Sequence, residues 1–293
     1  MRMKQPVRHI RDELYRDRGY DALWRLPNAG FVLRLDNQYI FLDPVLSSPH
    51  RYYETIRRRI QETGQIPHHQ VELQRHELDS IATEVHDPPL AAEEVEQADH
   101  IFITHGHEDH LDDDAIGVIS DLKPQVVAPK SCHPRLAEAG LTSKLLSTAI
   151  YGETHNYGNF SVEVVPADHS NSVSATVNSD ACGYLVRTVH GNFYLPGDGG
   201  FDHDGKSHIA QMEVHYLLVP INDTNLGVGF AALLTYLLQP RVVVPCHYGY
   251  THPPVRSQAG HPAEFVTALA ARGYDMPTTD IVILSPGGRL VLA

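Results

Sequence analysis

The chain has 293 residues, of which 42% are hydrophobic and 20% charged, so it is long enough to bury a sizeable core and is neither disordered nor fibrous. Its 36 acidic residues outnumber 23 Lys and Arg, and the resulting net charge of −13 repels nucleic acid and anionic membranes, which we therefore do not expect as partners. The 20 histidines are the outlying number, because imidazole is the commonest metal ligand among side chains.

The cysteines and the N-terminus indicate the compartment. Cys132, Cys182 and Cys246 are odd in number and far apart, which argues against a disulfide framework. The first twenty residues are charged throughout, and no run of about 18 apolar residues occurs, so we expect neither a signal peptide nor a transmembrane helix. The sequence thus predicts a cytoplasmic protein.

The first clear elements along the chain are two strands at 30–35 and 39–42, which are joined through the polar residues 36–38 as a hairpin. The segment 45–98 then loses this β character. Its pattern is helical at 51–63 and 90–97 and polar in between, so we expect an insertion or lid.

From residue 100 onward, short apolar strands alternate with helical stretches. The strands are predicted at 101–104, 126–128, 162–165, 183–189, 193–195, 216–219, 242–244 and 281–284, and the helices at 113–122, 134–139, 230–238 and 263–271. This alternation favours α/β layers. Since no repeat or linker divides the chain, we expect a single domain over 1–293 with a helical insertion at about 45–98.

The strand at 101–104 runs directly into a cluster of metal-ligand side chains. His105 and His107 are two positions apart, so in an extended segment both face one side. A turn beginning at Glu108 brings Asp109 and His110 round to a second point beside the first. The spacing therefore suggests two metal ions.

Three later strands end in the same way, with a ligand-type residue directly after an apolar run. These residues are His169, Asp198 and His247. Ligands collect at the carboxyl ends of strands in α/β architectures, so we expect the four strand ends to converge on one site. The glycines flanking Asp198 allow the backbone to pass close to a metal pair, which favours Asp198 as a bridging ligand.

This arrangement resembles the metallo-β-lactamase superfamily, whose H-x-H-x-D-H motif is met at positions 105–110. The resemblance covers the chain from about residue 25 to the end and implies a four-layer αββα sandwich. It implies that the first metal is held by His105, His107 and His169 and the second by Asp109, His110 and His247, with Asp198 bridging both.

Within the superfamily, residues 28–31, the hairpin ending at 42–44 and residues 220–223 look like the L-ascorbate-6-phosphate lactonase-like branch. The N-acyl phosphatidylethanolamine phospholipase D-like branch shares parts of this pattern. The usual Trp and Gly-His before the first strand are replaced by residues 26–28. A homo-oligomer is plausible by resemblance to the lactonase branch.

The predicted function is that of a metal-dependent hydrolase with two divalent ions, zinc in the first place and manganese or iron as alternatives. A hydroxide bound to the ions would attack a lactone or ester of a small, anionic, phosphorylated substrate. Asp198 and Asp109 are the predicted catalytic residues, because Asp109 or a bound water can protonate the leaving oxygen. Asp43 is either a hydrogen-bond partner that orients a ligand histidine or a turn-forming residue before proline.

Three other functions remain open. They are a phosphodiesterase of lipid or nucleotide esters, a non-catalytic metal-binding protein, and an iron-dependent oxidoreductase that works with a flavin partner. The first is separable only by assay. The second predicts a missing ligand, and the third predicts a flavodoxin-like extension after Leu290; the sequence shows neither.

Several neighbours of the motif have a structural interpretation. The acidic residues 112–114 are expected to cap the helix that follows them. Cys246 alternates with His247 along its strand and is predicted to lie in the core. Tyr248, His203 and His252 lie near predicted ligands and are either substrate contacts or ordinary loop residues.

Overall fold

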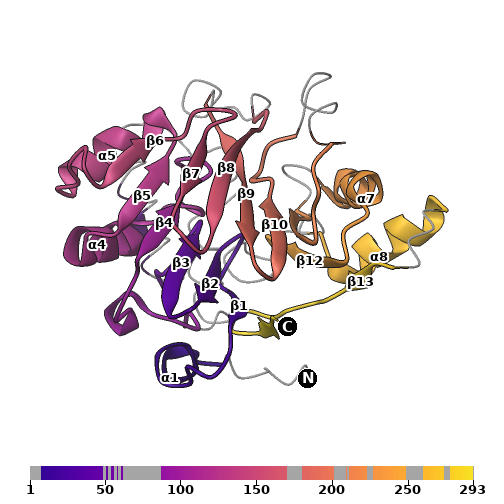
Figure 1. Ribbon diagram of the computed structural model, residues 1–293, viewed down its shortest axis with the longest axis horizontal. Helices are drawn as coiled ribbons and strands as arrows, with labels where there is room; N and C mark the ends of the chain where they lie inside the picture. Colours follow the sequence, from indigo (N-terminus) through magenta and orange to yellow (C-terminus); the bar gives the residue numbers. More distant parts are fainter. Residues whose placement is uncertain are drawn as a thin grey trace.

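Two sheets of seven strands each face one another in the computed structural model of the protein (Figure 1). The structure describes residues 8–48, 51, 54–55, 58, 61, 87–169, 180–200, 209, 211–222, 227–248, 260–273 and 278–292. The first sheet consists, in spatial order, of β14 (Arg289–Val291), β1 (Ala22–Arg25), β2 (Phe31–Leu35), β3 (Gln38–Leu42), β4 (His100–Phe102), β5 (Gln125–Ala128) and β6 (Leu146–Thr148). The second consists of β13 (Asp280–Ile281), β12 (Val242–Cys246), β11 (Tyr216–Pro220), β10 (Gly191–Leu195), β9 (Cys182–Thr188), β8 (Ser161–Pro166) and β7 (Thr154–Asn156).

Helices cover the outer face of each sheet. The first sheet packs against α1 (Arg11–Tyr15), α4 (Asp113–Leu122) and α5 (His133–Glu138), and the second against α7 (Gly227–Leu238) and α8 (Pro262–Ala271). Figure 1 shows these two groups of helices on opposite sides of the sheets. The short 3₁₀ turns η2 (Ala92–Glu94) and η3 (Lys130–Cys132) lie between strands in the chain. The layers have the order helix, sheet, sheet, helix, as the family resemblance implied.

Alternate residues of the central strands face two different cores, which explains why these strands read as unbroken hydrophobic runs. In β2, Phe31 and Leu33 pack between the sheets, whereas Val32 faces the helices. In β12, Cys246 packs between the sheets and Val243 faces α7 and α8. The prediction that Cys246 is a core residue is confirmed, since its side chain is fully buried.

The parallel pairing brings the chemistry-bearing strand ends together. β3, β4 and β5 are parallel to one another. In the second sheet β8, β10, β11 and β12 share one direction, because β9 is antiparallel to both β8 and β10. Asp43 and His105 therefore follow carboxyl ends at one sheet edge, and His169, Asp198 and His247 follow carboxyl ends at an edge of the other sheet.

The predicted hairpin is present as β2 and β3, with a two-residue turn at Asp36 and Asn37, both of which have positive φ angles. Two predicted elements are wrong in extent. The short helix at 90–97 is only the 3₁₀ turn η2, and the strand predicted at 281–284 is β13 at Asp280–Ile281, after which Val282 N still donates to Val243 O at 2.9 Å. Further along this segment, the carbonyl of Leu284 accepts hydrogen bonds from the side chains of Arg25 and Tyr248.

The sequence analysis also missed four short strands, β1, β6, β7 and β14, and the helix α1. In the predicted insertion, Arg51 and Arg58 are helical and their guanidinium groups pair with Asp114 and Asp113 of α4. Residues 62–86 lie outside the described residues. The single domain over 1–293 with its insertion stays a prediction.

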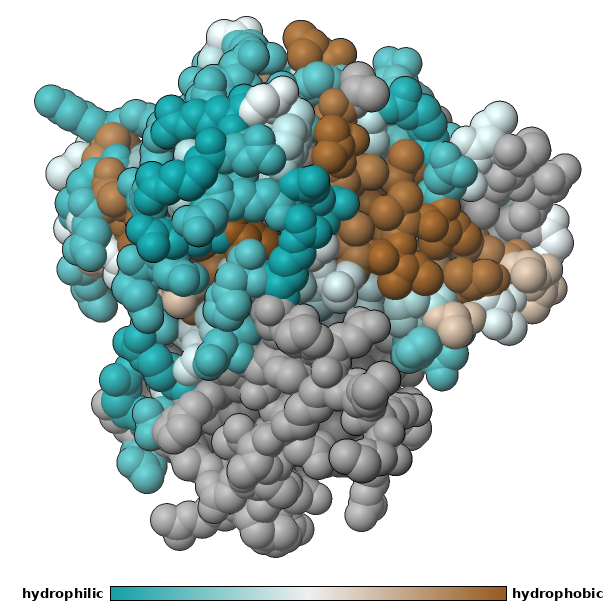
Figure 2. All heavy atoms as spheres, turned by 90° about the horizontal axis from the view of Figure 1, so that it is seen from below, coloured by the Kyte–Doolittle hydropathy of each residue, from teal (hydrophilic) through white to brown (hydrophobic). Residues whose placement is uncertain are grey.

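The surface differs between the two sides of the molecule. In Figure 2 hydrophobic residues gather in a patch at the right, the side on which Figure 1 places α7 and α8, and hydrophilic residues cover much of the left. The twelve residues of α7 include no charged side chain, and Tyr236 on this helix is 41% exposed. The predicted homo-oligomer stays a prediction. None of the helices in the described part of the chain is both long and apolar enough to cross a membrane.

Asp112 joins the start of α4 to the chain that follows β3. Its Oδ1 accepts the main-chain N–H of Ala115 at 2.7 Å, which is the predicted helix cap. Its Oδ2 accepts the N–H groups of Leu46 at 2.9 Å and Ser47 at 2.7 Å. Burial raises the pKa of Asp112 to about 6, so the carboxylate depends on these three donors at neutral pH.

We expect Asp112→Asn to lower the free energy of unfolding by about 1–3 kcal/mol. The amide nitrogen would replace one of the two carboxylate oxygens, so it would face a main-chain N–H group that has no other acceptor in this buried site. Urea denaturation measures the change. Asp121→Asn is the matched control, since Asp121 lies on the same helix and is exposed. Equal stability of the two variants would contradict this account of Asp112.

Candidate metal centre

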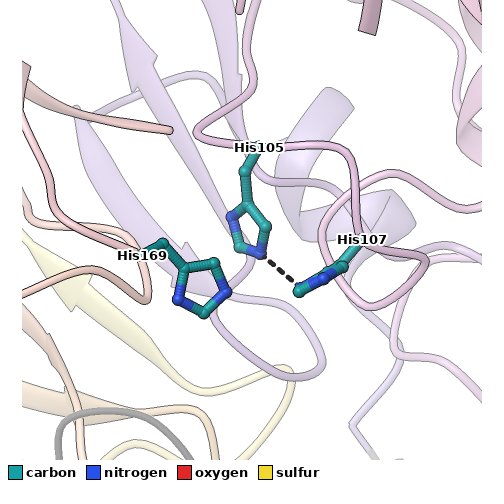
Figure 3. A group of neighbouring side chains, drawn as sticks. All are labelled: His105, His107 and His169. Carbon is teal, nitrogen blue, oxygen red and sulfur yellow. Dashed lines mark hydrogen bonds between the residues drawn. The ribbon is translucent and has the colours of Figure 1, made fainter. Parts of the chain in front are cut away.

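The structure gathers the seven predicted side chains into two groups. In each group the ligand atoms all lie within 4.8 Å of one another. The first group is His105, His107 and His169, and the second is Asp109, His110, Asp198 and His247. The rings of the first group converge on one region from two separate segments of the chain (Figure 3).

The geometry of the first group fits a tetrahedral metal ion. His105 Nε2 lies 2.9 Å from His107 Nδ1, and the ring centroid of His169 is 4.8 Å from that of His105 and 5.2 Å from that of His107. Ligand nitrogens around a tetrahedral zinc ion are about 3.3 Å apart. His169 Nε2 is buried and has no hydrogen-bond partner among the described residues. A divalent cation would satisfy such a buried acceptor.

The second group combines two imidazoles with two carboxylates. His247 Nε2 lies 3.3 Å from both Asp109 Oδ2 and Asp198 Oδ2, and His110 Nε2 lies 3.1 Å from Asp198 Oδ2. The ring centroids of His105 and His110 are 4.0 Å apart, so the two groups are direct neighbours. All four residues of the second group are buried.

Asp43 supports one histidine of each group, His110 directly and His105 through Thr104. Its Oδ2 lies 2.8 Å from His110 Nδ1 and accepts the hydroxyl of Thr104 at 2.6 Å. Because the only hydroxyl proton of Thr104 goes to Asp43, its oxygen accepts the N–H of His105 Nδ1, 3.0 Å away. These bonds hold both rings with Nε2 directed toward the groups described above, and they fix the tautomer of the neutral His105.

The same burial has opposite results for neighbouring imidazoles. Burial lowers the pKa of His105 well below its ordinary value, which keeps the ring neutral and able to bind a metal. Burial also disfavours the charged form of His110, but the carboxylates of Asp198 and Asp43 outweigh it and raise the pKa of His110 well above its ordinary value. The same balance, with Asp198 first among the carboxylates, raises the pKa of His247 to about 9.

Other residues near the predicted site have structural contacts. The hydroxyl of Tyr248 donates to the carbonyl of Leu284, and Asp168 forms an isolated β-bridge with Gly200. His203 and His252 lie outside the described residues. Sequence reasoning missed Thr104, whose only signal is its place directly before His105.

Comparison with known proteins places this geometry in a family. A family model described as the Beta-lactamase superfamily domain matches residues 25–247. The chain belongs to the metallo-β-lactamase superfamily. A UPF0173 metal-dependent hydrolase of Methanopyrus kandleri is 29% identical to it over 206 residues, which are 68% of this chain and 85% of the relative. This member of the superfamily is accordingly a metal-dependent hydrolase.

Solved structures of low sequence identity share the fold. A metallo hydrolase of the archaeon Ignicoccus hospitalis has a TM-score of 0.65 at 20% identity, with 93% of this chain and 98% of that chain covered. An isothiocyanate hydrolase from Delia radicum gut bacteria has a TM-score of 0.67 at 15% identity, with 92% of this chain and 98% of that chain covered. The predicted αββα metallo-β-lactamase fold is confirmed.

We expect Thr104→Val to weaken metal binding about 10–100-fold, because the isosteric side chain cannot link His105 to Asp43. It should also lower the free energy of unfolding by about 1–3 kcal/mol, since two buried polar groups lose a partner. Metal titration and urea denaturation measure the two effects. Thr104→Ser, which keeps the hydroxyl, should stay near wild type, and equal behaviour of the two variants would speak against the link.

A second prediction concerns pH. The raised pKa values of His110 and His247 stabilise the metal-free protein fully below about pH 6.5, and this contribution is lost as pH rises through about 9. A metal ion must displace these protons, so metal binding strengthens over the same range. We expect the increase in Tm on adding Mn²⁺ to be larger at pH 9 than at pH 6.5. Buried cysteines and tyrosines affect both forms alike, and an increase that shrinks with pH would refute the prediction.

Proposed function

We propose that the protein is a dinuclear hydrolase that cleaves a lactone or ester of a small, anionic, phosphorylated substrate. The observation that carries the proposal is the pair of adjacent groups, in which all the predicted ligand positions hold a suitable donor. Two separate groups, with ring centroids of His105 and His110 only 4.0 Å apart, favour two neighbouring ions over one.

The proposed ligand assignment follows the two groups, with one residue shared. The first ion would be held by His105, His107 and His169, the second by Asp109, His110 and His247, and both by Asp198. The negative charge of Asp198 acts on histidines of both groups. In the first group it opposes the stronger effect of burial, which lowers the pKa of His105 and His169, and in the second it raises the pKa of His247. This reach into both groups supports Asp198 as the bridging residue.

Zinc is the first choice of ion, with manganese or iron as alternatives, because imidazole and carboxylate donors suit all three. When bound, two such ions would lower the pKa of a coordinated water and polarise the oxygen of a carbonyl or phosphoryl group. Asp109, which is buried next to His247, would hold a proton and deliver it to the leaving oxygen. Asp198 orients His110 and His247 through its Oδ2.

Charge favours an anionic substrate. The buried carboxylates of Asp43, Asp109 and Asp198 carry at most three negative charges, whereas two divalent ions bring four positive ones. Until a coordinated water ionises, the centre would therefore be positive inside a protein whose net charge is −13. Such a contrast draws anions toward the ions and away from the rest of the surface.

Three alternatives are separated by their requirements. A phosphodiesterase would use the same residues, so only its substrates distinguish it. A non-catalytic metal-binding protein is disfavoured because no position of either group has lost its donor. An iron-dependent oxidoreductase would need a redox partner, and its ion would change oxidation state during turnover.

We expect protein purified without chelator to contain close to two metal ions per chain, as measured by plasma emission spectrometry. His107→Ala should abolish hydrolysis, a loss of at least about 1,000-fold, because it removes a donor from the first group. His9→Ala is the control, since His9 is an exposed histidine. Wild-type protein that holds one ion or none, and gains no activity on addition of zinc, manganese or iron, would refute the proposal.

The substrate class needs a panel assayed with the same metal-loaded protein. It contains a phosphorylated sugar lactone, its unphosphorylated analogue, bis(p-nitrophenyl) phosphate, a phospholipid and, because of the structural likeness to an isothiocyanate hydrolase, an isothiocyanate. We expect the highest kcat/KM for the phosphorylated lactone. A preference for the diester would favour the phosphodiesterase. A preference for the unphosphorylated lactone would contradict the proposal that the substrate is anionic.

A further inference from the structure

We propose that Asn28, in the turn between β1 and β2, is a positioning residue for the second group of ligands. It contacts the main chain of both Asp109 and His247, which come from different sheets. The inference rests on the proposed function, because it assigns Asn28 a role in holding the second of the two ions. No motif of the sequence analysis assigned it any role.

The turn that carries Asn28 is fixed against the metal centre. Leu26 N donates to Gly30 O at 2.8 Å, and Gly30 N donates to Pro27 O at 2.9 Å, which closes the turn. A Cβ atom on Gly30 would lie 2.8 Å from the carbonyl oxygen of Asp43, closer than such atoms can approach. Glycine therefore allows the turn to lie directly against Asp43, the residue that supports one histidine of each group.

Asn28 contacts the second group through both its backbone and its side chain. Its carbonyl oxygen accepts the N–H of His247 at 2.8 Å, and its Nδ2 donates to the carbonyl of Asp109 at 3.2 Å. The side chain is 1% exposed, so water does not compete effectively for either bond. Asn28 thus ties the loop after β4 to the end of β12.

The backbone of His247 needs such support. Its φ angle is +57°, a conformation that costs a non-glycine residue about 1–2 kcal/mol. The bond from its N–H to Asn28 helps to hold this conformation, which carries His247 Nε2 to within 3.3 Å of Asp109 Oδ2. If Asp109 shifts by even a fraction of an ångström, the donors of the second group no longer match one ion.

Asn28→Gly tests the side chain selectively. Asn28 itself has a φ angle of +52°, which glycine adopts without strain, so the variant keeps the backbone bond to His247 and removes the amide donor to Asp109. Asn37→Gly is the matched control. Asn37 also has a positive φ angle, +62°, and is exposed in the turn between β2 and β3.

The experiment is a chelator competition with metal-loaded full-length protein, in which the ions retained per chain are counted as the chelator is raised. We expect Asn28→Gly to lose one ion at a chelator concentration about 10–100-fold lower than wild type does and to retain the other as wild type does. Excess Zn²⁺ should restore its hydrolytic rate. Asn37→Gly should retain both ions like wild type.

Two results would overturn the inference and leave the proposed function intact. One is an Asn28→Gly variant that retains both ions as wild type does, and the other is a variant that loses both ions in parallel, which would indicate general loosening of the fold. The Tm of the metal-free variants identifies the second case. Wild-type protein that holds fewer than two ions would defeat the proposed function and, with it, the role of Asn28.

Discussion

The positions of the ligand side chains in the metal centre depend on the hydrogen bonds of the Asp43 carboxylate. It is fully buried, where an unpaired charge would be costly, and it accepts hydrogen bonds from the Thr104 N–H, the Thr104 hydroxyl and His110 Nδ1. These bonds fix the chain just after β4 at Thr104. They also hold His110 of the second group directly and His105 of the first group through the Thr104 hydroxyl. The backbone of Asp43 has a positive φ angle, and the three bonds help to hold that conformation.

The two sheets make this concentration of donors possible. β4 and β12, which lead to His105 and His247, are buried at every position, so packing fixes both strands along their whole length. The side chains of the centre therefore extend from rigid supports on both sheets. The turn at Asn28 then joins the sheets at the centre itself, where His247 and Asp109 come from opposite halves of the sandwich.

The sequence predicted what is local and missed what depends on distant partners. His105, His107, Asp109 and His110 stand within six positions, so strand and turn geometry alone could predict two groups. The long helices and buried strands were found because their apolar pattern is strong. The strand β1 was missed because only three apolar residues precede Arg25, which is nevertheless buried, with its guanidinium on the carbonyl of Leu284 and over the ring of Tyr248. The link through Thr104 joins residues 61 positions apart, which no local pattern reveals.

The two groups differ in charge although they are adjacent and only His107 among their seven residues is partly exposed. His105 is backed by the neutral hydroxyl of Thr104 and stays neutral, whereas His110 is backed by the carboxylate of Asp43 and has its pKa raised. In the metal-free protein, the protonated imidazoles of the second group balance Asp198, whose pKa they lower against the effect of burial. The carboxylates of the second group thus require a nearby positive charge, which a metal ion supplies when it is bound and protonated imidazoles supply when it is absent. In the first group burial lowers the pKa of His105 and His169 and so disfavours their charged forms, and the different partners of His105 and His110, Thr104 and Asp43, make the two neighbouring sites chemically distinct.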